Sequence, residues 1–221
     1  MKVPRSTAAI ILAAGSSSRM GSGRHKLLLL LDGRPVLAHV IEATLASQAR
    51  PVIVVLGHQA DLVRSHIHSY LTHPDIILVN NTDYLQGMST SMHMGIQVFT
   101  TGNSEKPAFS HLVDSTLIIL GDQPMITSRV IDALIMTYRM TGKRIIAPRY
   151  DGKRGSPVLF DASLFSELMK VTGDEGGRTV LERHSQEVEL IEVGDALANY
   201  DVDTWEAYQQ VVEIWEHKKG G

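Results

Sequence analysis

The stretch "AAIILAAGSSSRMG" (residues 8–21) changes abruptly from seven apolar residues to a loop of glycine, serine and arginine. A short apolar run that ends at glycine is typical of a strand buried on both faces. Small residues after such a strand let backbone N–H groups approach an anion. The stretch therefore predicts a buried first strand that leads into an anion-binding turn.

A secretory signal is the alternative interpretation of this region. Lys2 and Arg5 precede the apolar run, and the run ends in small residues. The candidate signal would cover residues 2–14, and its apolar core is at the lower edge of the roughly 7–15 residues that such signals use. We therefore favour the strand.

Composition narrows the class of protein. The 221 residues suffice for one sizeable α/β domain, and 43% apolar with 20% charged residues is ordinary for a soluble protein. A formal charge of −3 gives no basic field for nucleic acid, so no nucleic-acid partner is expected. The absence of cysteine rules out thiolate sites and suits a cytoplasmic location. No apolar run approaches the ~20 residues that span a bilayer, so we expect no membrane partner.

Strand-like and helix-like segments alternate along the chain. Short β-branched runs occur at 52–56, 76–80, 116–120, 144–148 and 188–193. The segments between them carry apolar residues at helical spacing, such as Val36, Leu37, Val40 and Ile41. Strands that are apolar throughout and joined by crossover helices predict a mostly parallel sheet covered on both faces, which is a three-layer α/β fold.

The rhythm changes in the last third of the chain. "RYDGKRGSPVLFD" (149–161) predicts a hairpin or loop excursion, and a helix is expected at 165–171. A last helix is predicted from Asp203 to Glu216. We expect one domain over residues 1–216 and a flexible tail, "HKKGG", over 217–221.

The loop after the first strand fails two familiar phosphate motifs. Ser17 occupies the second glycine position of G-x-G-x-x-G. Five residues separate Gly15 from Gly21, and Ser22 stands where the Walker pattern needs lysine. What remains is a loop of small residues with two nearby cations, Arg19 and Lys26 (residues 15–26), which is compatible with phosphate binding or with a solvated turn.

Several blocks, in order, resemble one known family. "LAAGSSSRMGSGRHKLLLLLDGRPVLAHVI" (12–41) resembles L-A-A-G-x-S-x-R-M-G-x-x-K-L-L-L-P-L-x-G-x-P-L-L of the MobA-like nucleotidyltransferases. The resemblance continues in "NTDYLQGMSTSMHMGI" (81–96), "LGDQPMI" (120–126), "RGSPVLFDASLFSELMKVTGDEGGRTVL" (154–181) and "YDVDTWEAY" (200–208). Within the family, the blocks look most like the molybdenum cofactor cytidylyltransferases. Leu30, Ser156 and Trp205 depart from the usual Pro, His and Pro, and Ser156 falls where the acceptor is expected.

The resemblance implies a fold and an activity. The fold would be the Rossmann-like nucleotide-diphospho-sugar transferase fold with a mixed, mostly parallel sheet. The enzyme would transfer CMP from CTP to the terminal phosphate of molybdopterin with Mg²⁺ and release pyrophosphate, and a molybdenum hydroxylase apoenzyme would be a further partner. Two alternatives remain open: a pyrimidine nucleotidyltransferase that acts on a sugar or polyol phosphate, and a non-catalytic nucleotide-binding partner of a molybdenum hydroxylase.

The same resemblance assigns the nucleotide site. Arg19, Lys26 and Asp122 would be catalytic, and Ser91 and Asn81 would face the base and ribose. The full nucleotide set is Leu12, Ala13, Ala14, Gly15, Ser16, Arg19, Lys26, Asn81, Gly87, Ser91 and Asp122. Relatives that use guanine nucleotides typically have glycine at the position of Ala14, so the methyl group predicts CTP over GTP. Ordinary capping hydroxyls are the structural alternative for residues 89–91.

Two carboxylates are expected to hold the metal. Asp122 follows the apolar run 116–120, and Mg²⁺ prefers oxygen ligands and needs only one or two carboxylates. The structural alternative is a turn or cap residue before Pro124. Asp203 matches the family's second metal carboxylate, with Asp201 beside it, but it is equally suited to cap the final helix.

Loops in the second half are expected to receive the acceptor. The resemblance assigns Gln123, Arg154, Gly155, Ser156, Asp174 and Arg178 to this role. Arg154 and Arg178 would clamp a phosphate bidentately. Ordinary loop turns with solvated arginines are the alternative.

Overall fold

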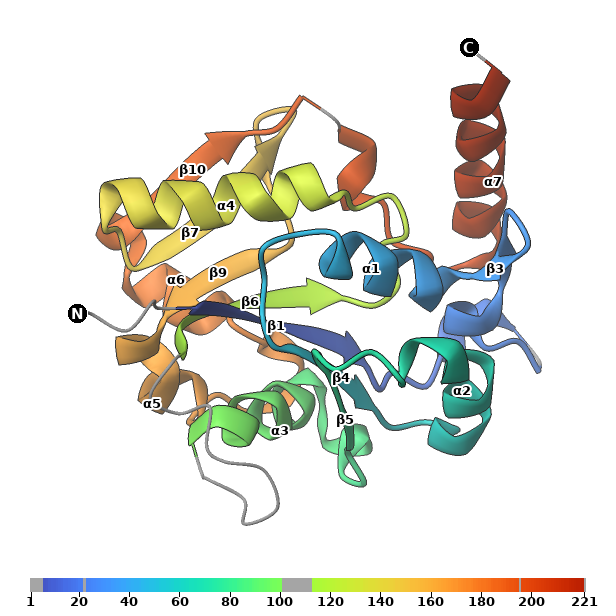
Figure 1. The fold of residues 1–221 in the computed structure, drawn as a ribbon, viewed down its shortest axis with the longest axis horizontal. Helices are drawn as coiled ribbons and strands as arrows, with labels where there is room; N and C mark the ends of the chain where they lie inside the picture. The colour runs from blue at the N-terminus through green and yellow to red at the C-terminus, as the bar shows by residue number, and fades with distance from the viewer. Residues whose placement is uncertain (1–5, 22, 101–112, 195, 221) are drawn as a thin grey trace.

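The structure is a computed structural model, and it describes residues 6–21, 23–100, 113–194 and 196–220. A central sheet is formed by β1 (Ser6–Ala13), β4 (Val52–Leu56), β5 (Ile76–Asn80), β6 (Val113–Leu120), β7 (Ile145–Tyr150), β8 (Lys153–Arg154), β9 (Val158–Asp161) and β10 (Val188–Glu192). The helices are α1 (Val36–Leu45), α2 (Ala60–His66), α3 (Met88–Thr100), α4 (Ser128–Thr141), α5 (Phe165–Leu168), α6 (Arg178–Arg183) and α7 (Trp205–Gly220). They lie on both sides of the sheet, with α7 at one end (Figure 1). A small separate ribbon pairs β2 (Leu30–Leu31) with β3 (Arg34–Pro35).

The strand order places the first strand at a switch point. The order is β10-β7-β9-β6-β1-β4-β5, with β8 paired to β7. β1 is parallel to both of its neighbours, β4 and β6, whereas β9 runs antiparallel between β6 and β7. The chain builds outward from β1 on one side and then continues with β6 on the other. In sheets of this kind, ligands bind beyond the carboxyl ends of the strands at the point where the order reverses.

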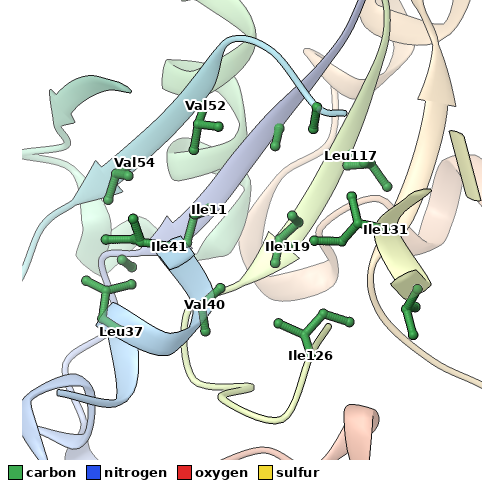
Figure 2. Packing of buried hydrophobic residues seen from close by; sticks show 14 of the residues in the cluster. Ile11, Leu37, Val40, Ile41, Val52, Val54, Leu117, Ile119, Ile126 and Ile131 are labelled. Atoms are coloured by element: carbon green, nitrogen blue, oxygen red, sulfur yellow. The ribbon is translucent and has the colours of Figure 1, made fainter. Parts of the chain in front are cut away.

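Alternate residues of the strands pack against different helices. Ala9 and Ile11 of β1 lie in a cluster with apolar residues of α1, α2 and α4, whereas Ala8 and Ile10 lie in a cluster with residues of α3, α5 and α6. All four side chains are fully buried. Figure 2 shows the first cluster, with Ile11 near Leu37 and other apolar side chains of α1. Burial on both faces explains why β1 is apolar at every position from Ala8 to Ala13.

The structure confirms the predicted fold class. The sheet is mixed and mostly parallel, and helices cover both of its faces. The predicted strands 52–56 and 76–80 coincide with β4 and β5, and 116–120 is the end of β6. Residues 6–13 form strand β1 inside the sheet. They include most of the apolar run that the alternative interpretation assigned to a secretory signal.

Several predicted boundaries in the last third were wrong. The excursion predicted at 149–161 consists of the end of β7, β8 and β9. β9 also pairs with β6 in the main sheet, and its apolar pattern is too short to predict this strand from the sequence. The helix expected at 165–171 ends at Leu168. The last helix begins at Trp205 and continues beyond Glu216 to Gly220, so residues 217–220 of the predicted tail are helical. His217 and Lys218 are compatible with a helix, and the first glycine of this segment is Gly220.

In the described part of the chain, the structure contains no helix that is both long enough and apolar enough to cross a membrane.

Candidate functional site

A cavity of about 610 Å³ lies beyond the carboxyl ends of β1 and β6. The loop after β1 and the start of the loop after β6 form much of its wall, as the switch point predicts. Of the predicted site residues, those that line it are Leu12, Ala13, Ala14, Gly15, Ser16, Arg19, Lys26, Gly87, Ser91, Asp122, Asp174 and Asp203. The structure therefore brings most of the predicted nucleotide set together around one cavity.

Four of these side chains form a charged cluster, defined here as Arg19, Lys26, Asp122 and Asp203. The Nζ atom of Lys26 donates to Oδ2 of Asp122 and, at 2.6 Å, to Oδ1 of Asp203. Arg19 Nη2 lies 2.9 Å from the other oxygen of Asp203. The side chains of Lys26 and Asp122 are each only 14% exposed, whereas that of Arg19 is 70% exposed. The cluster is thus shielded at its base and open to solvent at Arg19.

Mutual attraction within the cluster fixes its charge states. Burial alone would lower the pKa of Lys26, but the charge of Asp122 and the hydrogen bonds to both carboxylates outweigh it and raise the pKa. Burial would raise the pKa of Asp203, but Lys26 and Arg19 more than offset it and lower the pKa. Lys26 is therefore cationic and Asp203 anionic at neutral pH.

The pKa of a nearby carboxylate, Asp201, is shifted in the opposite direction to that of Asp203. Its pKa is raised by desolvation and by the charge of Asp122. Gln123 Nε2 donates to Oδ1 of Asp201 at 2.6 Å, which opposes the rise. Asp201 also lines the cavity, so three aspartates contribute to this wall.

A separate hydrophobic cluster holds the segments that carry these charges. Met20, Met125 and Val202 pack with residues of α1 and α7 and are at most 4% exposed. Met20 follows Arg19, Met125 lies three residues after Asp122, and Val202 lies between Asp201 and Asp203. The backbone N–H of Val202 also donates to the carbonyl of Asp122 at 2.9 Å. Burial of the neighbours therefore positions side chains from distant parts of the sequence at one wall.

The loop after β1 has two local constraints. Ser17 has a left-handed φ of 56°, and its Oγ accepts a 3.1 Å hydrogen bond from the backbone N–H of Lys26. This bond ties the two ends of the segment that carries the two cations. Ala14 packs closely against Gly57, the first residue after β4: a Cβ placed on Gly57 would lie 2.7 Å from the Ala14 Cβ. Residue 14 therefore sits against a backbone that leaves no extra space.

The structure decides against the capping alternative for Asp203. Thr204, rather than Asp203, caps α7: its Oγ1 accepts a 3.2 Å bond from the N–H of Ala207. The carboxylate of Asp203 faces Lys26 and Arg19 instead. Asp122 lies in a turn, as its structural alternative predicts, and its carboxylate also contacts Lys26 and lines the cavity.

The opposite wall is built from the first turn of α3. Ser91 is 4% exposed and lines the cavity, but Asn81 is buried behind it and does not. Gly87 has a φ of 109°, and a Cβ there would lie 2.4 Å from the carbonyl carbon of Gly173. Asp174 Oδ1 accepts a 3.0 Å bond from the N–H of Met88 at the start of α3. Asp174, predicted to contact the acceptor, therefore joins the loop at 173–175 to this helix.

The remaining acceptor residues lie outside the cavity lining. Gln123 is 2% exposed and bonded to Asp201. Arg154 is exposed on β8, and the backbone N–H of Ser156 donates to Asn199 Oδ1 at 3.0 Å. Gly155 packs against Asn199 and Tyr150, where a Cβ would clash. Arg178 is 74% exposed and pairs with Glu182 at 2.9 Å. The structure therefore places Gln123 beside the charged cluster through Asp201, whereas Arg154, Gly155, Ser156 and Arg178 make their contacts elsewhere.

Some cavity residues were absent from the sequence-based set. Ser17, Ser18, Leu27, Tyr84, Leu85, Met88, Leu120 and Asp201 also line the cavity. Tyr84 and Leu85 follow the end of β5, so their position after a parallel strand was an available signal. The sequence offered Asp201 beside Asp203 as a candidate carboxylate or helix cap, and the spacing of two residues directs both side chains toward one edge of an extended segment.

The donor set is compatible with one divalent cation. Oxygens of Asp122 and Asp203, from separate segments, both contact a single cation, the Lys26 ammonium. Two carboxylate oxygens that converge in this way suit Mg²⁺, which completes its shell with water and substrate phosphate. Among the described residues, no group of three or more His, Cys, Asp or Glu side chains is arranged to hold a metal without such help.

Comparisons with known proteins identify relatives in sequence and in fold. A Nitrosomonas europaea protein named bifunctional protein GlmU is 30% identical over 148 residues, which are 66% of this chain and 29% of that protein. The chain therefore spans less than a third of that relative's length. The Rv0371c homologue from Mycobacterium sp. strain JC1 is similar with a TM-score of 0.78 and 27% identity, over 96% of this chain and 97% of that one.

A further solved structure and a family model complete the comparison. Rv0371c of Mycobacterium tuberculosis, in complex with manganese, has a TM-score of 0.71 and 23% identity over 95% of this chain and 99% of that one. Similarity over almost the whole chain confirms the predicted nucleotide-diphospho-sugar transferase fold. The family model described as the MobA-like NTP transferase domain matches residues 9–188. The chain therefore belongs to the MobA-like NTP transferase family.

Proposed function

We propose that this protein transfers CMP from CTP to the terminal phosphate of a molybdopterin acceptor, with Mg²⁺, and releases pyrophosphate. The observation that carries the proposal is the convergence of Arg19, Lys26, Asp122 and Asp203 beside the small-residue loop after β1. Simple nucleotide binding does not require two carboxylates next to a triphosphate site, because they repel an anion. Nucleotidyl transfer requires them, because the metal that they hold compensates this charge.

The reaction is a displacement at the α-phosphorus of CTP. An oxygen of the acceptor's terminal phosphate forms a bond to the α-phosphorus, and the bond from that phosphorus to the oxygen bridging to the β-phosphate breaks. Pyrophosphate leaves with the electron pair of the broken bond. The attacking phosphate is already an anion at neutral pH, so this chemistry needs charge stabilisation more than a general base.

The residues of the charged cluster have distinct parts in this reaction. Lys26 keeps its proton because its pKa is raised, so it supplies a fixed positive charge at the shielded base of the cavity. The exposed Arg19 binds phosphate oxygens at the solvent side, where the leaving group departs. Asp122 and Asp203 hold Mg²⁺, which when bound neutralises charge on the phosphates. Backbone N–H groups around Gly15 and Ser16 approach the triphosphate without steric obstruction.

Base and acceptor choice rest on separate features. Ala14 lines the cavity and its methyl group packs against Gly57, so we expect it to leave less space for a purine than for a pyrimidine. Tyr84, Leu85 and Met88 form an apolar side of the cavity, and Leu85 is 80% exposed. An exposed apolar surface next to a phosphate site supports an acceptor that combines a flat ring with a phosphate, as molybdopterin does. The blocks that resemble the cytidylyltransferases support the same acceptor.

A turnover assay with a panel of acceptors tests the proposal. Pyrophosphate release would be measured with CTP and Mg²⁺ in the presence of molybdopterin, with and without bound metal, and of representative sugar and polyol phosphates. We expect release that depends on molybdopterin. Release that depends on a sugar or polyol phosphate instead would identify a different pyrimidine nucleotidyltransferase. Tight CTP binding without release from any acceptor would favour a non-catalytic partner of a molybdenum hydroxylase.

A further inference from the structure

The orientation of one buried amide, that of Asn81, follows from its hydrogen bonds. Asn81 is 2% exposed and follows the end of β5. Its Oδ1 accepts a 2.9 Å bond from the backbone N–H of Asp83. A backbone N–H can only donate, so the atom that it contacts must be the amide oxygen. The amide nitrogen therefore points the other way, toward α3.

The amide nitrogen then fixes the direction of two hydroxyl groups. Nδ2 carries two protons, and it lies 2.9 Å from Thr90 Oγ1 and 2.9 Å from Ser91 Oγ. Both hydroxyls must accept from it, because an amide nitrogen offers no lone pair. Thr90 in turn donates its own proton to the carbonyl of Gly87 at 2.9 Å, so its requirement is met within the protein.

The hydroxyl proton of Ser91 is in a different situation. Ser91 Oγ has no hydrogen-bond partner other than Asn81 among the described residues. The residue is 4% exposed and lines the cavity, whereas Thr90 does not line it. A buried hydroxyl proton without an acceptor is unfavourable, so a ligand atom that accepts it gains affinity, whereas a ligand atom that can only donate leaves this proton unsatisfied and binds less well.

We infer that Asn81 is a positioning residue that makes Ser91 an obligatory hydrogen-bond donor, and that Ser91 thereby selects a nucleoside with an acceptor at this point. The inference rests on the proposed function in that it takes the ligand to be CTP. On its pairing edge cytosine presents two acceptors, O2 and N3, beside one amino donor, whereas guanine presents one acceptor, O6, beside two donors, N1–H and the 2-amino group. Ser91 would therefore contact the O2/N3 side of cytosine, and the same side of guanine offers only donors. Asn81 thus contributes to base choice without touching the base.

The variant Asn81→Asp reverses this polarity with almost no change of shape. Its first oxygen still accepts from Asp83 N–H, but the second oxygen now requires a donor, and Ser91 turns its proton toward it. Ser91 then presents only a lone pair to the cavity. We expect the affinity for CTP to fall roughly 10- to 100-fold, which is typical for a lost buried hydrogen bond at a specificity site. The loss should appear in KM and leave kcat nearly unchanged, because the base is remote from the reacting phosphorus.

A double-mutant cycle separates this effect from general damage. In a Ser91→Ala background, Asn81→Asp should change CTP affinity less than threefold, since the hydroxyl that it turns is gone. Thr90→Ala is the matched control: it also removes a bond to Asn81, but it should lower Tm without changing the preference among CTP, UTP, GTP and ATP. If Asn81→Asp does not fold, Asn81→Ala replaces it in the cycle. Free rotation of Ser91 should then narrow the gap between CTP and GTP.

The outcomes distinguish this inference from the proposed function. An equal loss of CTP affinity from Asn81→Asp with and without Ser91 would overturn the inference, as would an unchanged KM. A wild-type protein that prefers another nucleoside triphosphate would contradict the proposed substrate. The cycle would then be measured with that preferred nucleotide, and non-additivity would still support the positioning role of Asn81. If the protein bound none of the four nucleotides, both the inference and the proposed function would be contradicted.

Discussion

The proposed nucleotide side and the proposed acceptor side of this molecule differ in how firmly their residues are held. On the nucleotide side, Lys26, Asp122 and Asp203 lie in one shielded cluster, and buried neighbours such as Met20 and Val202 anchor their segments. On the acceptor side, Arg154 and Arg178 are exposed and lie outside the cavity lining. Exposed charged side chains keep many rotamers and contribute little to a preorganised site.

This difference suggests a division of labour. Electrostatic catalysis works when charges are already in place before the reaction, which matches the shielded cluster. Recognition of a large acceptor tolerates residues that become ordered on binding, at a cost in affinity. We therefore expect substitutions on the nucleotide side to change kcat or the choice of nucleotide, and substitutions on the acceptor side to change only acceptor KM.

Replacement of Asp122 should have the largest effect. Asp122→Asn removes one negative charge from the site proposed to hold Mg²⁺ and preserves the shape of the side chain. We expect kcat to fall on the order of a hundredfold or more, similar to loss of another electrostatic stabiliser. Single-turnover rates over a Mg²⁺ titration would measure the loss, with Tm as the control for folding. A fully active variant would show that Asp122 is not catalytic, and it would contradict the proposed difference between the nucleotide side and the acceptor side.

Two adjacent residues at the start of α7 offer a matched pair. Asp203→Asn should lower kcat roughly tenfold or more, because it weakens both the contact to Lys26 and the second metal carboxylate. Thr204→Ala should leave kcat unchanged but reduce the free energy of unfolding by about 1 kcal/mol, because it removes the cap. Rates and denaturant unfolding of both variants test this. An active Asp203→Asn enzyme would leave Asp122 as the single metal carboxylate.

The Ala14 methyl group should have an intermediate effect that is visible only in selectivity. We expect kcat/KM for CTP to exceed that for GTP by roughly tenfold to two hundredfold, the range for steric and hydrogen-bond discrimination in a pocket. Ala14→Gly should narrow this gap, mainly by improving turnover of GTP. Competition between the two nucleotides in one reaction measures the ratio. Equal use of GTP and CTP by the wild-type protein would show that the methyl group does not select the base.

Arg178 should show the smallest effect. Its side chain is largely exposed and forms an ion pair with Glu182 on the same helix. Arg178→Ala should raise the acceptor KM by less than about tenfold, as expected for an exposed ion pair, and leave the CTP KM unchanged. Initial rates at varied acceptor concentration give both values. A large loss of kcat would show that the acceptor side closes onto the reacting phosphates and would invalidate the division proposed here.

The sequence was most informative about candidate site residues that directly follow a buried strand. Leu12 to Ser16 and Asp122 were placed correctly because parallel strands bring their carboxyl ends to one edge, whatever the distance along the chain. The positions of Arg154 and Ser156 depended instead on β8 and β9, short strands whose pairing is set by tertiary contacts. The role of Thr204 as the cap was missed because Asp203 is an equally good capping residue by type. The positions of Lys26 and Arg19 in the folded chain show why Asp203 does not act as the cap.

The most direct test of nucleotidyl transfer at this cavity follows the phosphorus atoms of CTP. CTP labelled at the α-phosphate and CTP labelled at the γ-phosphate would each be incubated with the protein, Mg²⁺ and molybdopterin, and the products separated. The account predicts that the α label appears in the pterin product and the γ label in pyrophosphate, and that Asp122→Asn suppresses both. Release of the γ label as orthophosphate, or retention of both labels in CTP, would contradict it.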